Sequence, residues 1–288
     1  MRESKPTIYD PNFLPNMIYS GVPSWLNLSV IENDEDLKKI DAAVVGVPWE
    51  GGCTIGGYSS TTEGPKAVRS TSIRYTGFLP DYNLDCFDYL KVADSGDIAT
   101  QNGNYDFTFK SIRERIGKLA DAKIIPITIG GDHGIAYPII SEIAKRYPKK
   151  VGVLHFDAHL DNYSHFGDDE LSRCSPFYRV YNDPNMDPTK IAHIGIRGPR
   201  NHREEYNNAM KYGATVIRAI DVHEDGWKAS ISKALEVVSK DTEYIYITVC
   251  ADSLDAANMP QAPQGRFPQS QSPRAPASPA SWSIMSSS

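Results

Sequence analysis

The stretch from Val151 to Asp161 constrains the fold of this chain more than any other part of the sequence. It opens with an apolar run, Val151 to Phe156, that is typical of a buried strand in a parallel sheet. Asp157, His159 and Asp161 follow at a spacing of two, and residues two apart in extended backbone point the same way. The sequence therefore predicts that these side chains converge just beyond the carboxyl end of a strand, where open α/β sheets bind their ligands.

The chemistry of these three side chains indicates a metal site. A carboxylate–imidazole–carboxylate set suits Mn²⁺, Zn²⁺ or Ni²⁺ better than Ca²⁺, because Ca²⁺ prefers oxygen ligands only. The alternative is a strand end that carries solvated polar residues. Three coordinating residues on one predicted face favour the metal site over that alternative.

Strand and helix patterns alternate along most of the chain. Strands are predicted at 41–48, 86–92, 124–129 (interrupted by Pro126), 151–156, 191–196, 216–222 and 244–249. A turn is predicted at 94–97, and helices are predicted from 63 onward and at 107–122, 135–147 and 226–239. Repeated strand–helix–strand units predict an α/β fold with a mostly parallel central sheet and right-handed crossovers.

Composition divides the chain into three segments. Residues 1–35 are rich in Pro, Asn and aromatic residues and are expected to form an irregular N-terminal arm. Residues 36–260 are predicted to form one domain. Residues 261–288 contain Pro, Ser, Gln and Ala but no acidic residue, so we expect a disordered tail. Because the alternation stops directly after a strand, we expect the domain to be incomplete at its C-terminal end.

Charge and cysteine content narrow the class of protein. The net charge of −6 argues against a nucleic-acid partner. The four cysteines show no close pairing or zinc-finger spacing, which indicates reduced thiols. The N-terminal residues lack the apolar core of a signal peptide, and no run reaches membrane-spanning length. We therefore expect a cytoplasmic protein without a membrane partner, and a mitochondrial location stays open.

Two further polar motifs follow predicted strands. Gly130-Gly-Asp-His133 comes after one strand, and Cys250-Ala-Asp-Ser-Leu-Asp255 comes after the strand that begins at Tyr244. Together with Asp157-Ala-His-Leu-Asp161, these motifs resemble the three signatures of the ureohydrolase family, which includes arginases, agmatinases and guanidinobutyrases. Segments 64–69, 94–97 and 195–197 also resemble agmatinase-like sequences, so the resemblance covers roughly residues 40 to 260. It implies an arginase-like three-layer α-β-α fold and a homo-oligomer, a trimer or hexamer.

The resemblance also implies a dinuclear manganese centre. His133, Asp157 and Asp161 would hold one metal ion, and Asp157 would bridge to a second ion that His159 and Asp252 also bind. A hydroxide shared by the two ions would attack the guanidinium carbon of an agmatine-like substrate and release urea and an amine. Asp161 would accept a hydrogen bond from that hydroxide and orient it. Loops 49–58 and 163–177 would contact the aliphatic arm of the substrate.

Three positions depart from the family pattern. Cys250 stands where the family has a metal-bridging aspartate, and a thiolate suits Ni²⁺ or Zn²⁺ better than Mn²⁺. Arg173 stands where the family has a histidine, and His165 is a nearby substitute. No acidic residue follows Asp255 to contact the substrate. These departures keep open a catalytically impaired or truncated paralogue that acts as a binding subunit. A metal deacetylase with a related sheet is a third, less favoured reading.

Overall fold

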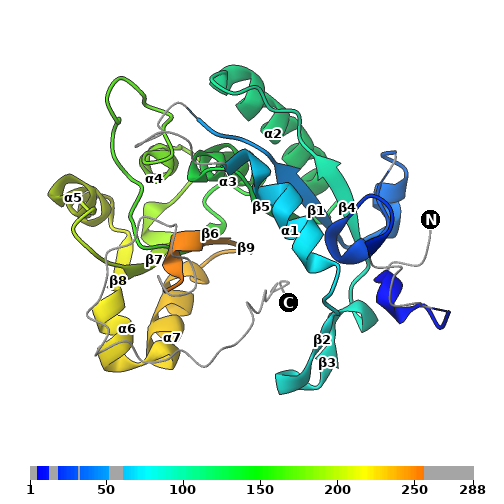
Figure 1. The fold of residues 1–288 in the computed structure, drawn as a ribbon. Coiled ribbons are helices and arrows are strands. Elements are labelled where there is room, and N and C mark those ends of the chain that lie inside the picture. The colour runs from blue at the N-terminus through cyan, green and yellow to red at the C-terminus, as the bar shows by residue number, and fades with distance from the viewer. Residues whose placement is uncertain (1–4, 13–18, 32, 52–60, 256–288) are drawn as a thin grey trace. The chain divides into compact units, whose positions relative to one another are not determined.

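The computed structural model describes residues 5–12, 19–31, 33–51 and 61–255, and it divides into two compact units between Ile139 and Ile140. Each unit has its own parallel sheet (Figure 1). The boundary lies within helix α3 (Ala136–Arg146). The predicted tail at 261–288 and most of the glycine-rich loop at 49–58 lie outside the described residues.

The first unit is built around strand β1 (Ala42–Val47), whose residues are all buried. It pairs in parallel with β4 (Val92–Asp97) on one side and with β5 (Ile125–Gly130) on the other. Central strands of parallel sheets are covered on both faces, which explains the uninterrupted apolar run of β1. Helices α1 (Gly64–Ser72) and α2 (Tyr105–Asp121) pack against β5, and a short antiparallel hairpin joins β2 (Phe78–Leu79) to β3 (Leu84–Asp85).

Two predictions for this unit are wrong in their details. The predicted strand at 86–92 begins only at Val92, because the Asp85 carboxylate accepts a hydrogen bond from Phe87 N and turns the chain into a short 3-10 helix. The predicted turn at 94–97 is instead the end of β4. There the Arg69 guanidinium binds the Asp94 carboxylate at 2.8 and 2.9 Å, and this pairing allows an acidic residue to be buried in a strand.

Strand β5 is continuous, although the sequence predicts an interruption at Pro126. Proline has no N–H to donate, so it is tolerated where one side of a strand lacks a partner. Strand β5 is at the edge of its sheet as the described residues define it, with β1 as its neighbour.

The second unit contains a parallel sheet of four strands in the order β8, β7, β6, β9. The bounds of these strands, in the same order, are Thr215–Arg218, Ile191–Ile196, Val151–Phe156 and Tyr244–Val249. The helices are α4 (Pro176–Tyr181), α5 (Arg203–Tyr212), α6 (Ala219–Asp225) and α7 (Trp227–Val238). The predicted strands at 151–156, 191–196 and 244–249 and the parallel arrangement are therefore confirmed.

Helix α7 covers one face of this second sheet (Figure 1). Its Ala234 and Val238 pack into a buried cluster with Leu154 and Ile217 of the strands. A side chain at Gly152 of β6 would overlap the carbonyl oxygen of Val238, so glycine is required for this close approach. The packing buries β6 in the interior of the unit. The polar loop that begins at Asp157 follows its carboxyl end.

The predicted strand at 216–222 is only half correct. Strand β8 ends at Arg218, and helix α6 begins at Ala219. The Asp221 carboxylate accepts a hydrogen bond from Arg218 N at 2.7 Å, which satisfies an amide at the start of the helix. Among the described helices, no segment is long and apolar enough to cross a lipid bilayer.

Candidate metal centre

Three of the predicted ligands come together at the carboxyl ends of two neighbouring strands. Asp157 directly follows β6, and Asp252 lies in the short 3-10 helix η10 (Ala251–Ser253) that follows β9. His159 Nδ1 lies 2.9 Å from Asp252 Oδ2 and 3.6 Å from Asp157 Oδ1. Ligand atoms of the three residues all lie within 4.8 Å of one another. All three residues belong to the second unit. The pairing of β6 with β9 is what brings Asp252 next to Asp157 and His159.

The loop that carries Asp157, His159 and Asp161 is bent and not extended. Strand β6 ends at Phe156, and the Asp157 Oδ1 atom accepts a hydrogen bond from His159 N at 2.7 Å. Such a side-chain-to-backbone bond closes an Asx turn. Asp161 has a φ of +45°, in the left-handed region. The convergence of Asp157 and His159 therefore arises from a turn, and the strand-like alternation expected from the spacing is wrong.

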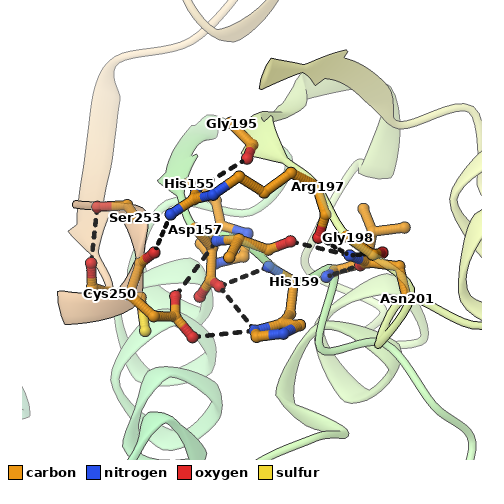
Figure 2. Close-up of polar contacts among 12 residues, drawn as sticks. His155, Asp157, His159, Gly195, Arg197, Gly198, Asn201, Cys250 and Ser253 are labelled. Carbon is orange, nitrogen blue, oxygen red and sulfur yellow. Dashed lines mark hydrogen bonds and ion pairs between the residues drawn. The ribbon is translucent and has the colours of Figure 1, made fainter. Parts of the chain in front are cut away.

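Asn201 holds this loop in place. Its amide oxygen accepts from Leu160 N at 3.1 Å, and its amide nitrogen donates to Ala158 O at 2.9 Å and to Arg197 O at 2.8 Å (Figure 2). The residue thus satisfies backbone groups on both sides of His159. These hydrogen bonds fix the backbone on both sides of His159 and so hold its imidazole beside the carboxylates.

Arg197 fixes the second part of the cluster. Its guanidinium donates to the carbonyl oxygens of Asp252 at 2.6 Å, Leu254 at 2.9 Å and Gly195 at 3.2 Å. Figure 2 shows this side chain reaching from the end of β7 towards the segment that contains Cys250 and Ser253. Arginine thereby ties η10 to β7 and positions the Asp252 carboxylate beside His159.

The electrostatics of His159 indicate a site suited to a cation. Burial by itself lowers the pKa of His159, but the carboxylates of Asp157 and Asp252, with a contribution from Asp161, outweigh burial and raise the pKa to about 10. A metal ion bound at this ring would have to displace the proton, because only the neutral imidazole is a metal ligand. Its Nε2 atom is buried and has no hydrogen-bond partner among the described residues. The donor set of two carboxylates and one imidazole fits a divalent transition metal.

His133 belongs to the first unit, where it begins the short 3-10 helix η8 (His133–Ile135) after β5. Asp132 shapes this turn, because its carboxylate accepts hydrogen bonds from Gly134 N at 2.9 Å and Gly51 N at 2.6 Å. A Cβ at Gly131 would come within 2.6 Å of the Val47 carbonyl oxygen, so the motif requires glycine there. That His133 joins Asp157 at a metal ion stays a prediction.

Cys250 lies beside the cluster because of strand register. Val249 of β9 pairs with Phe156 of β6, so Cys250 and Asp157 both emerge at the same level of the sheet edge. The Cys250 amide donates to the Phe156 carbonyl oxygen at 2.9 Å and continues the ladder by one residue. The side chain at position 250 is therefore well placed to bind a metal ion, and in this chain it would do so through a thiol.

Sequence reasoning missed two buried histidines, His155 and His193, and the Tyr181 hydroxyl that contacts the second of them. A signal for the histidines is present in the sequence. Each histidine lies within an otherwise apolar strand, and His155 is two residues before Asp157, so the two side chains share a face. The tyrosine carries no comparable signal, because only the packing of α4 against β7 brings its hydroxyl to His193.

Glu205 provides a pH-dependent prediction. Burial raises the pKa of this carboxyl to about 7, although His202 N donates a hydrogen bond to it. The folded chain then holds the proton more tightly than the unfolded chain. The protonated Glu205 carboxyl therefore adds to the free energy of unfolding. This contribution is fully present below about pH 4.5 and is lost as pH rises towards 7. Glu205→Gln is expected to raise the free energy of unfolding at pH 8 by about 1 to 3 kcal/mol.

The measurement is urea unfolding between pH 5 and pH 8 in the presence of EDTA. The wild-type profile should fall with pH, and the Glu205→Gln profile should be flatter. Glu204→Gln, at the exposed neighbouring position, is the matched control and should follow the wild type. Parallel profiles for the wild type and Glu205→Gln would show that the buried carboxyl is already ionised at low pH.

Comparisons with known proteins agree with the motifs and the fold. The family model described as "Arginase family" matches residues 40–263. The guanidinobutyrase of Pseudomonas aeruginosa is 29% identical over 244 residues, which are 84% of this chain and 74% of that protein. The mitochondrial agmatinase of Gallus gallus is 31% identical over 242 residues, which are 83% of this chain and 68% of that protein.

A solved structure also resembles this chain. The proclavaminate amidino hydrolase of Streptomyces clavuligerus superimposes with a TM-score of 0.73 and 26% identity, over 83% of this chain and 77% of that one. The likeness confirms the predicted three-layer α-β-α fold class with a mostly parallel sheet. The family model covers most of the chain and includes all three motifs. The chain belongs to the arginase family, the ureohydrolases.

Proposed function

We propose that this protein is a metal-dependent amidinohydrolase that cleaves a linear, agmatine-like guanidino compound into urea and an amine. The single observation that carries the proposal is the convergence of Asp157, His159 and Asp252 at the carboxyl ends of β6 and β9. This cluster belongs to a chain of the arginase family. The relatives are named for guanidinobutyrate, agmatine and an amidino compound, which supports the guanidino group as the reacting part of the substrate.

Metal ions, Mn²⁺ by family resemblance, would supply hydroxide at neutral pH when bound at this site. Asp157, His159, Asp252 and, in our proposal, His133 and Asp161 would hold them. The carboxylates of Asp157 and Asp252 neutralise positive charge at the base of the site. Asp161 would accept a hydrogen bond from the hydroxide and orient it towards the guanidinium carbon. The Asn201 and Arg197 hydrogen bonds keep these groups preorganised, so little reorganisation is needed during the reaction.

Substrate selection would fall to the loop at 163–177, which connects the metal-binding loop to α4. Arg173 of this loop is half-buried. A guanidinium of the protein repels a guanidinium substrate, so Arg173 remains a departure from the family pattern in this loop. We expect the protein to work as a homo-oligomer, in line with the family resemblance.

The test combines metal analysis with urea release. Purified protein should contain divalent metal and should release urea from at least one member of a panel of agmatine, guanidinobutyrate, arginine and guanidine. EDTA should stop the release, and added Mn²⁺ should restore it. Metal-loaded protein that releases no urea from any of these compounds would count against turnover. It would favour the impaired paralogue that acts as a binding subunit.

A further inference from the structure

A run of buried hydrogen bonds leads from Asp157 into the core of the second unit. Asp157 Oδ2 lies 3.0 Å from His155 Nε2, and the Nδ1 atoms of His155 and His193 are 2.7 Å apart. His193 Nε2 lies 2.6 Å from the Tyr181 hydroxyl, and Asn162 Nδ2 donates to that hydroxyl at 3.4 Å. All five side chains are buried, and Tyr181, the most exposed, has an exposed fraction of 4%.

Strand register and aromatic packing build this run. His155 of β6 and His193 of β7 are direct register partners, so the sheet itself brings the two rings together. The Phe177 ring centroid lies 4.1 Å from that of His155 and 5.0 Å from that of His193. The phenyl ring therefore covers both imidazoles with apolar surface. In such surroundings each hydrogen bond is strengthened by the low local dielectric.

Atom types determine the direction in which protons are donated along the run. A carboxylate only accepts, so His155 Nε2 donates to Asp157. A neutral His155 then has a lone pair on Nδ1, and His193 Nδ1 must donate to it. The remaining nitrogen of a neutral His193, Nε2, therefore accepts from Tyr181. Burial raises the pKa of the Tyr181 hydroxyl above its usual value, so the hydroxyl keeps its proton.

With the neutral rings, every donor in the run points towards Asp157. The two oxygens of Asp157 consequently have different roles. Oδ2 is held in the core by His155, whereas Oδ1 faces the loop and accepts from His159 N. Oδ1 is also the atom that lies nearest to the His159 ring nitrogen in the candidate metal centre. A carboxylate that is held through one oxygen presents the other in a defined direction, which lowers the entropic cost of metal binding.

We propose that Tyr181 and His193 are positioning residues that act through His155 to orient Asp157 for a divalent cation. This inference rests on the proposed function, because it takes the Asp157 cluster to be a metal site. The Tyr181 hydroxyl stabilises the His193 tautomer that donates to His155, and this contact in turn supports the His155 tautomer that donates to Asp157. Without the hydroxyl, His193 Nε2 loses its donor, and the His193 tautomer with the proton on Nε2, which cannot donate to His155, becomes competitive.

The experiment measures Mn²⁺ affinity by calorimetric titration of EDTA-stripped protein. Tyr181→Phe is expected to weaken binding by about 10-fold, the size of effect seen when partners of metal ligands are removed. His193→Leu should weaken binding by about 10- to 100-fold. His193→Gln should stay close to the wild type, because its amide can donate to His155 while its oxygen accepts from Tyr181. Tyr178→Phe, on the same helix and outside the run, is the matched control.

Thermal unfolding in EDTA separates positioning from a purely structural role. Equal Mn²⁺ affinity in Tyr181→Phe and His193→Leu, together with a lower melting temperature, would overturn the inference. Failure of the proposed function is distinguishable. If the wild type binds Mn²⁺ and releases no urea while the variants bind more weakly, the positioning role stands and the amidinohydrolase does not. Wild-type protein that binds no Mn²⁺, Ni²⁺ or Zn²⁺ would overturn both.

A second measurement needs no variant and applies even if a variant fails to fold. Nitrogen-15 chemical shifts distinguish a protonated ring nitrogen from one with a lone pair. In the wild type loaded with Zn²⁺, which is diamagnetic and leaves nearby signals visible, His155 is expected to be protonated at Nε2 and His193 at Nδ1. The opposite tautomers, or an imidazolium at His155, would contradict the proposed direction of the run.

Discussion

Asp157→Asn is expected to abolish urea release and to weaken Mn²⁺ binding by at least about 100-fold, more than the loss of a partner behind a ligand. Asparagine matches aspartate in size and can still accept a hydrogen bond from His159 N. It lacks the negative charge, however, and its NH₂ group faces either His155 or the cation. The measurements are urea release with the panel of guanidino compounds and Mn²⁺ titration of stripped protein.

The control for this prediction is Asp225→Asn, at the last residue of helix α6. Asp225 is exposed, and the same loss of one negative charge there should leave activity and metal affinity unchanged. A melting temperature in EDTA close to the wild type would show that Asp157→Asn still folds. If Asp157→Asn kept wild-type activity, the assignment of the metal centre to the carboxyl end of β6 would be wrong.

Cys250→Asp is expected to strengthen Mn²⁺ binding by about 10-fold or more and to increase urea release in the presence of Mn²⁺. Mn²⁺ prefers hard carboxylate oxygens, whereas a thiolate is soft and suits Zn²⁺ or Ni²⁺. The register of β9 with β6 places this residue next to Asp157, so a new carboxylate would arise at the cluster. The expected increase should be largest with Mn²⁺ and smallest with Zn²⁺.

Cys250→Ser separates the two causes of such an increase. It removes the thiol without adding a carboxylate, so it should not reproduce the tighter Mn²⁺ binding. An equal increase in both variants would mean that the thiol hinders the site and that a carboxylate is not needed. Weaker Mn²⁺ binding in Cys250→Asp would show that the wild-type centre relies on the sulfur ligand, and the metal would then be Zn²⁺ or Ni²⁺.

Much of the fold follows from local patterns that the sequence displays openly. Strands β6, β7 and β9 have the predicted bounds. A short apolar run flanked by polar residues is typical of a buried strand in a parallel sheet, so its ends can be read from the sequence. Where tertiary contacts compete with local preference, prediction fails. Asp94 is read as part of a turn from its own chemistry, but the buried Arg69 guanidinium keeps it in a strand.

The candidate site shows the same division. The polar residues that follow β6 and β9 are visible in the sequence, and their residue types indicate a metal ion. The spacing of two predicted that Asp157 and His159 lie together, and they do, but a bend and not an extended strand brings them together. The bend that brings them together is closed by a hydrogen bond from His159 N to the Asp157 carboxylate and is held by Asn201. A residue more than 40 positions away cannot be paired with this loop by a local pattern.

The sequence by itself determined the family, the α/β class and the residue types of the candidate metal centre, because these depend on motifs and on short-range periodicity. Only the tertiary structure decided that His155, His193 and Tyr181 form one buried run behind Asp157. It also decided that Arg197 holds Asp252 in place. The physical reason is that hydrogen-bond partners of buried groups are selected by packing, and packing joins segments that are far apart in the chain.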